Sequence, residues 1–207
     1  MKKRFIILLS LAVLAGPPAQ GDEQAHSGRL PEGEIIVRSA RDQSKGGGAS
    51  VTALMHAPPE RIWDTLLSCA RAREYMAGMT YCEVLEFDGK RGKIRHVIDQ
   101  PWPLPPLDIV FRSTYQPYSY IESSLVEGNL SQFLAEWRFE ETPQGELVEY
   151  TVHIVPTYPV PRFFVRHYML QRLPDMLACL RALADASGSA AQNKADAGRC
   201  QPGKPLD

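Results

Sequence analysis

The stretch from His56 to Cys69 reads HAPPERIWDTLLSC and predicts a change from strand to helix. It follows ASVTALM, in which the inward and outward positions alternate as they do in a strand. Pro59 suits the first turn of a helix, because its missing N–H would have no partner there, and Glu60 lies near the positive end of the helix dipole. Apolar side chains then recur at helical spacing at Ile62, Trp63, Leu66, Leu67 and Ala70. We therefore expect two short helices after this strand, the second at about residues 72–77.

The segments on either side of this stretch have the alternation and turns of antiparallel strands. Turn sequences such as Asp88-Gly89 and Gly128-Asn129 separate them, and strands joined this tightly are usually neighbours in one sheet. The expected strands are residues 34–40, 49–57, 81–87, 93–99, 107–116, 120–127, 131–140 and 146–155.

The longest predicted element is a helix from Arg162 to about Ala186, with a broad apolar face. One strand, two short helices, a run of antiparallel strands and a long last helix are typical of an α+β domain. We expect a curved antiparallel sheet of about seven strands that wraps around the C-terminal helix.

The N-terminus carries the pattern of a secretory signal. The basic residues MKKR precede a short apolar segment, and small residues before position 22 suit cleavage after Gly21. We expect residues 1–21 to be a signal peptide, 22–33 a flexible segment, 34–186 the domain and 187–207 a disordered tail. This organisation predicts export across the inner membrane of a bacterium into the periplasm.

Charge and motifs exclude several classes of function. Removing residues 1–21 takes away three of 23 basic residues and none of 24 acidic ones, which leaves a net charge of about −4 and does not favour nucleic acid. The histidines form no metal-binding pair, and no phosphate-binding loop or nucleophile elbow occurs. We therefore assign no catalytic residue, metal or cofactor. The four cysteines allow three disulfide connectivities, of which Cys69–Cys82 with Cys179–Cys200 closes the shortest loops.

From about Ala49 to Ala184 the chain resembles the SRPBCC superfamily of START-like helix-grip domains, and within it the polyketide cyclase/dehydrase and coenzyme Q-binding group. Four pieces carry the resemblance in order: APPERIWDTL, YMAGMTYCEVLEFDG, VEGNLSQFLAEWRFEETPQG and VPTYPVPRFFVRHYMLQRLPDMLACLRALAD. It implies a deep apolar cavity between the sheet and the last helix, which holds a lipid, quinone or polyketide-like molecule. The signal sequence departs from mitochondrial and ribosome-associated members, so those roles do not carry over.

Strand parity indicates which side chains face such a cavity, although a filled core would give the same pattern. Our candidates for ligand binding are Trp63, Phe111, Tyr115, Phe133, Trp137, Tyr150, Val152, Phe164 and Tyr168. The proline-rich connector at 101–106 is either a rigid hairpin loop or a rim of the cavity with Trp102 over its mouth.

These observations leave three functional classes open. The first is an exported, non-catalytic carrier of a hydrophobic small molecule, with transient membrane contact. The second is an enzyme of the cyclase/dehydrase kind that uses an inward Tyr or His as acid or base. The third is a protein-interaction domain whose core is collapsed.

Overall fold

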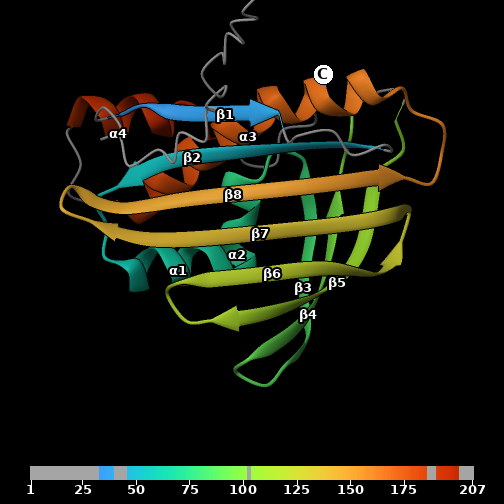
Figure 1. Cartoon of the computed structure of the whole chain (residues 1–207), viewed down its shortest axis with the longest axis horizontal. Coiled ribbons are helices and arrows are strands. Elements are labelled where there is room, and N and C mark those ends of the chain that lie inside the picture. Colours follow the sequence, from blue (N-terminus) through green and yellow to red (C-terminus); the bar gives the residue numbers. More distant parts are fainter. Residues whose placement is uncertain (1–32, 40–45, 102–103, 186–189, 201–207) are drawn as a thin grey trace, which may run out of the picture.

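In the residues that the computed structural model describes, 33–39, 46–101, 104–185 and 190–200, eight strands form one antiparallel sheet (Figure 1). Their order across the sheet is β1-β2-β8-β7-β6-β5-β4-β3. The last strand, β8, therefore lies beside β2, and β1 and β3 are the edge strands. The strands are β1 Ile35–Ser39, β2 Gly47–Met55, β3 Met79–Phe87, β4 Arg91–Ile98, β5 Leu107–Gln116, β6 Tyr120–Gly128, β7 Leu130–Thr142 and β8 Gly145–Pro156.

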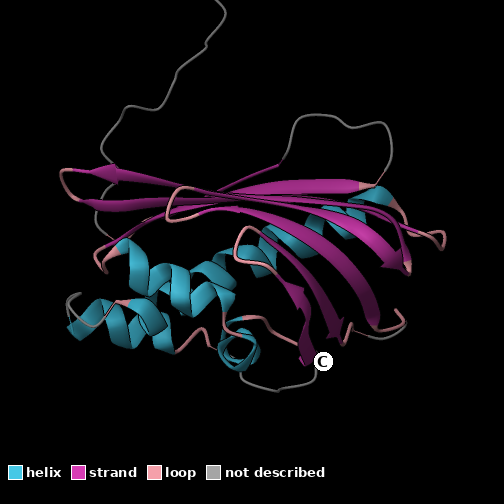
Figure 2. Ribbon diagram, turned by 90° about the horizontal axis from the view of Figure 1, so that it is seen from below, coloured by secondary structure: helices cyan, strands magenta, loops and turns pink. Residues whose placement is uncertain are grey.

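The helices lie on one side of this sheet (Figure 2). They are α1 Pro59–Leu67, α2 Cys69–Tyr75, α3 Arg162–Ala184 and α4 Ala190–Ala197. Helix α1 begins at its proline, as the missing N–H of Pro59 predicts, and buries Ile62 and Trp63. Helix α2 begins three residues earlier than expected, because the Ser68 side chain accepts a hydrogen bond from the N–H of Arg71 at 3.4 Å and caps it.

The sheet is strongly curved toward the helices. In Figure 1 the strands β3, β4 and β5 run steeply across the direction of β7 and β8. Register shifts interrupt the β3–β4, β5–β6 and β7–β8 ladders, and such irregularities bend a strand and increase its twist. This curvature gives the sheet a concave face.

Helix α3 packs against β1 and β2, at one edge of the concave face. The inner face of β2 carries small side chains there, and a Cβ atom at position 47 would lie 2.9 Å from Cγ1 of Val165. Gly47 therefore allows the helix to approach the strand closely. At the other end of the helix, Asp185 accepts a hydrogen bond from the N–H of His56 at 3.0 Å, which fixes the end of α3 to the end of β2.

Helix α4 is held onto α3 by a buried ion pair and a disulfide. The Arg181 guanidinium donates to both carboxylate oxygens of Asp196, at 2.7 and 3.0 Å, and also to the carbonyl oxygen of Leu54. The Cys179–Cys200 disulfide joins the same two segments. Buried charges of this kind are stable only when paired, so α4 belongs to the folded domain.

The structure confirms the predicted α+β helix-grip architecture. Its eight strands correspond to the eight expected segments, one more than the expected sheet of about seven. One expectation needs correction. Residues 190–197, which we expected to lack order, form α4, because the buried Arg181 provides a partner for Asp196 that composition alone does not reveal. The predicted signal peptide lies outside the described residues. Within them, no helix combines the length and apolar character needed to cross a membrane.

Candidate functional site

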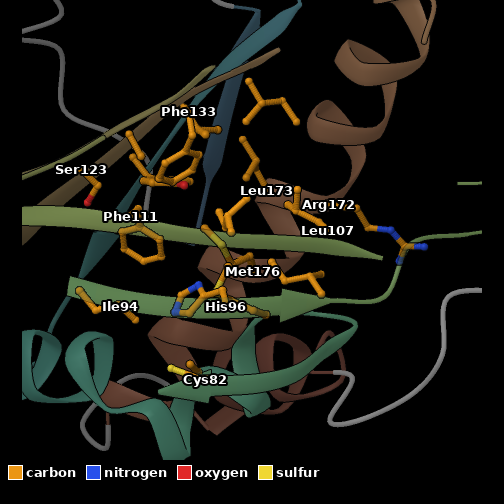
Figure 3. Close-up of a pocket in the computed structure, with 18 of the residues that line it drawn as sticks. Cys82, Ile94, His96, Leu107, Phe111, Ser123, Phe133, Arg172, Leu173 and Met176 are labelled. Carbon is orange, nitrogen blue, oxygen red and sulfur yellow. The ribbon is translucent and has the colours of Figure 1, made fainter. Parts of the chain in front are cut away.

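A cavity of about 490 Å³ lies between the concave face of the sheet and helix α3 (Figure 3). Strands β3 to β8 form one wall, and the end of α1, α2 and the inner face of α3 form the other. The size is within the range of small-molecule sites, which are mostly apolar with a few polar groups.

The middle of the cavity is lined by apolar and aromatic side chains from β4, β5 and β7. The rings of Phe111 and Phe133 lie 5.4 Å apart, and with Ile94, Ile109 and Leu130 they form a second apolar cluster beside the main core. Strand alternation brings these side chains to one face, because each is separated from the next inward residue of its strand by two positions. The curvature of the sheet leaves space in front of them that no side chain fills.

His96 is the titratable group in the middle of this apolar wall. Its strand neighbours Ile94 and Ile98 also line the cavity, and its ring contacts the edge of Phe111 at 4.8 Å (Figure 3). Burial lowers the pKa of His96 to about 4, so the imidazole is neutral at physiological pH. Among the described residues it has no hydrogen-bond partner, which leaves one N–H and one lone pair for a molecule in the cavity.

A pair of serines forms a polar spot toward the far end of β5. The hydroxyl oxygens of Ser113 and Ser123 lie 2.7 Å apart on neighbouring strands, and both side chains line the cavity. Tyr115 follows on the same face of β5, where burial raises the pKa of its hydroxyl. Gly92 leaves room for this ring, because a Cβ at position 92 would lie 2.8 Å from the Tyr115 hydroxyl oxygen.

Two further tyrosines contribute rings to the cavity. Tyr150 of β8 stacks on Trp137 of β7 with ring centroids 4.2 Å apart, and burial raises its pKa. Tyr168 of α3 has a pKa that burial raises and the positive charge of Arg172 lowers to a smaller extent. Both hydroxyls are therefore protonated at neutral pH and can donate a hydrogen bond, but they are poor bases.

The rim of the cavity along α3 is polar and partly exposed. Arg172 lies over the Tyr168 ring at 5.8 Å from its centroid, and Figure 3 shows it on the same side of the view as Leu107, away from Ile94 and Ser123. Asp175 and Arg199 also border the cavity and pair at 3.4 Å. The site thus combines an apolar interior with a charged rim.

A sequence profile described as polyketide cyclase / dehydrase and lipid transport matches residues 55–181, more than half of the chain. The chain belongs to this family. A search of curated protein sequences found no match.

Three solved structures with the same fold are all below 25% identity, so the likeness shows the fold alone. The STAR-related lipid transfer protein of Xanthomonas axonopodis is 16% identical with a TM-score of 0.64, over 75% of this chain and 95% of that chain. Human STARD10 is 11% identical with a TM-score of 0.62, over 76% and 71%. The lipid transfer and protein localization domain of human StarD13 is 14% identical with a TM-score of 0.59, over 73% and 84%.

The sequence pattern predicted nine side chains that line the cavity and could bind a ligand. The structure places eight of them along the cavity: Phe111, Tyr115, Phe133, Trp137, Tyr150, Val152, Phe164 and Tyr168. Trp63 does not line it. Its ring packs between Tyr115, Tyr118 and Phe139, at 6.2, 5.7 and 5.6 Å, because helix α1 presents its apolar face to the end of the sheet. That the eight bind a ligand stays a prediction.

Several polar side chains of the cavity, among them His96 and Arg172, were not among the predicted site residues. The parity of β4, which places Ile94, His96 and Ile98 on one face, was the signal that could have identified His96. Arg172 lies on the broad inner face of α3, one turn after Tyr168, where sequence spacing does not distinguish a cavity rim from solvent. His153 lies on the other face of its strand, where its Nδ1 is buried without a partner among the described residues.

The remaining predictions near the site concern the cysteines and the proline-rich connector. The structure has the disulfides Cys69–Cys82 and Cys179–Cys200, the pairing with the shortest loops. The first joins α2 to β3 beside the cavity. Leu104 of the connector lines the cavity, whereas Trp102 lies outside the described residues.

Proposed function

We propose that this protein is an exported carrier of a hydrophobic small molecule, such as a lipid, quinone or polyketide-like compound, which it holds in the cavity between the sheet and α3. The observation that carries the proposal is the cavity of about 490 Å³ with a mainly apolar lining. Exposing such a molecule to water costs about 0.8 kcal/mol per methylene group, which is the physical reason for a carrier. A collapsed interaction domain would not retain a space of this size.

The protonation states in the cavity favour binding over acid–base catalysis. Burial keeps His96 neutral with a pKa of about 4 and raises the pKa of Tyr115 and Tyr150. An efficient general base has a pKa close to the working pH, and none of these groups is shifted in that direction. They are better suited to hydrogen bonds with a bound oxygen atom.

Two disulfides support export to an oxidising compartment. The Cys69–Cys82 and Cys179–Cys200 bonds persist in the periplasm but are rare in the cytosol of mesophiles. Expression of the full chain in a bacterium, followed by fractionation and N-terminal sequencing, tests this. We expect periplasmic protein that begins at Asp22. Full-length protein that stays in the cytosol would contradict export.

Transient contact with a membrane is part of the proposal, and the first turn of α3 is the surface that suits it. Phe163 and Phe164 have exposed fractions of 63% and 56%, and their rings lie 4.3 Å apart. Phe164 also lines the cavity, and Arg162 and Arg166 flank the pair with no acidic residue in the first turn. Aromatic and basic side chains together favour an anionic lipid surface.

Vesicle cosedimentation tests this contact. Phe163→Ser with Phe164→Ser should reduce binding to vesicles that contain phosphatidylglycerol, because the two largest exposed apolar surfaces of this turn are removed. Tyr118→Ser, which alters an exposed ring on the β5–β6 turn, is the control and should bind as the wild type does. If the wild type binds no vesicles, or the double variant binds equally well, the contact surface is wrong.

Native mass spectrometry of protein purified without detergent tests the carrier function. We expect a bound mass that organic solvent extracts. Ala135→Phe places a ring in the cavity and should remove this mass, whereas Leu134→Phe, on the outward and 40% exposed neighbour, should retain it. Wild-type protein that remains empty after incubation with lipid vesicles would overturn the proposal.

The second candidate function is a cyclase/dehydrase-type enzyme. The hydroxyl- and imidazole-bearing side chains of the cavity favour it, among them His96, Tyr115 and Tyr150. Tyr115→Phe and Tyr150→Phe distinguish the two functions. In a carrier, these substitutions should cause a modest loss of affinity for the co-purified molecule, and that molecule should be released chemically unchanged. An enzyme should convert it, and the loss of a catalytic hydroxyl should lower turnover about 100-fold or more.

A further inference from the structure

We propose that the ligand is an amphiphile with an anionic head group, and that Arg172 binds this head at the rim of the cavity while the apolar body extends inward past His96. The inference rests on the proposed carrier function and names the chemical class of its ligand.

The guanidinium of Arg172 is available to a ligand. It borders the cavity and lies over the Tyr168 ring at 5.8 Å, and no carboxylate among the described residues pairs with it. Contact with the ring holds the side chain in place without neutralising its charge. A fixed guanidinium with unused donors matches a carboxylate or a phosphate, which it can bind through two parallel hydrogen bonds.

Among the described residues that border the cavity, the charges other than Arg172 cancel each other. Arg199 and Asp175 pair at 3.4 Å, with half-exposed side chains, so together they contribute no net charge. The rim therefore carries one excess positive charge, on Arg172. A neutral head group would leave that charge without a partner when the ligand covers it, and desolvating a charge without a partner is costly.

The interior excludes a small inorganic anion as the main ligand. Figure 3 shows Leu107 on the same side of the view as Arg172. From Leu107 the inward face of β5 continues through Ile109 and Phe111 to Ser113. Six residues of strand span roughly 20 Å, most of it apolar. A molecule that uses both the rim and this length must have a charged end and a long apolar body. His96 and the Ser113–Ser123 pair can accept or donate one hydrogen bond along the way.

Displacement of the uncharged dye Nile red from delipidated protein tests the inference. The competitors are palmitate and palmitoyl lysophosphatidic acid, with methyl palmitate and monopalmitoylglycerol as their uncharged counterparts. We expect each anion to displace the dye at about tenfold lower concentration than its counterpart, which corresponds to about 1.4 kcal/mol for a charge-assisted contact. Preference for palmitate or for the phosphate identifies which anion the head carries.

Variants assign the preference to Arg172. With Arg172→Gln, charged and uncharged competitors should displace the dye at equal concentrations, while Nile red still binds. Arg172→Lys should restore part of the preference for anions. Arg112→Gln removes an exposed arginine of β5 that does not border the cavity, and should keep the full preference.

The outcomes separate this inference from the carrier function. If the wild type binds the dye but does not distinguish anions from neutral lipids, the inference fails and the carrier function stands. The same holds if Arg172→Gln retains the preference. If neither the dye nor any competitor binds, the carrier function itself fails.

Discussion

Helix α3 meets the sheet in two different ways. Against β1 and β2 it is in direct contact, and we call this the packed region: the inward side chains of β2 are small or medium in size, and Ala49, Val51, Ala53 and Met55 have exposed fractions of 0%. Toward β3 to β7 the sheet curves away, and we call this the hollow region, where the large side chains of Phe111 and Phe133 face empty space. Small side chains thus occur where the helix touches the sheet, and large ones where it does not.

The difference indicates how one fold combines stability with a binding site. A cavity costs stability because the atoms around it lack contacts. At the same end of the domain, a buried ion pair and the Cys179–Cys200 disulfide join α3 to the segment that contains α4. These links hold α3 independently of the hollow region. The helix can therefore remain in place whether or not a ligand supports its other face.

The largest expected effect comes from breaking the buried ion pair. Asp196→Asn leaves Arg181, whose side chain is 2% exposed, without its anionic partner, and such losses cost about 3–5 kcal/mol. The control is Asp175→Asn, which breaks the pair with Arg199 at the rim of the hollow region. Both partners there are half exposed, so we expect a cost below about 1 kcal/mol. Urea unfolding measures both; equal costs would contradict the distinction between the two regions.

The stability contributions of the two regions can be compared directly through two leucines that lie one turn apart on α3. Leu177 is fully buried against the packed region, whereas Leu173 lines the cavity. Leu177→Ala should lower the free energy of unfolding by about 3–4 kcal/mol, because a filled site cannot collapse around the lost atoms. Leu173→Ala should cost about half as much, since some of its contacts are already missing. Chemical denaturation of the ligand-free protein provides the measurement, and a larger cost for Leu173→Ala would contradict the assignment of the hollow region.

Acid should lower the free energy of unfolding through His96, which lies in the hollow region. Its pKa is about 4 in the folded protein, below the ordinary value of 6.5, so between these values the unfolded chain binds the proton and the folded one does not. The contribution of His96 to the free energy of unfolding is therefore fully present above pH 6.5. It is lost as the pH falls toward 4, by at most about 3 kcal/mol. His96→Gln should flatten this part of the stability profile. A variant with the same slope as the wild type would show that His96 is not desolvated.

The sequence predicts the packed region better than the hollow one, for a physical reason. Pro59 and the helical spacing after it locate α1, and strand parity correctly places Phe111 and Phe133 on the inner face, because these signals are local. Whether an inward side chain meets another one or an empty space depends on the curvature of the whole sheet. That is why Trp63, on a correctly predicted helix face, packs on Phe139 instead of lining the cavity.

The same reason explains the polar residues of the site. Arg172 lies on α3 one turn after Tyr168, and its position at the cavity rim depends on where the sheet curves away from the helix. Helical periodicity carries no such information. The alternation of β4 does place His96 inward, but only the depth of the cavity shows that its imidazole is desolvated.

The smallest expected effect shows whether the hollow region is dry when no ligand is bound. The Ser113 and Ser123 hydroxyls lie 2.7 Å apart, so Ser113→Ala alone leaves one buried hydroxyl without its partner. In a dry cavity this costs about 1 kcal/mol, and the double variant with Ser123→Ala recovers most of it because no orphan remains. In a hydrated cavity water replaces the lost partner, and each single variant is nearly neutral.

A double-mutant cycle in ligand-free protein measures the coupling between the two serines. We expect a clear coupling energy, because a wall of Ile94, Phe111 and Phe133 offers water few hydrogen bonds. Additive single effects would show instead that water fills the space until a ligand displaces it.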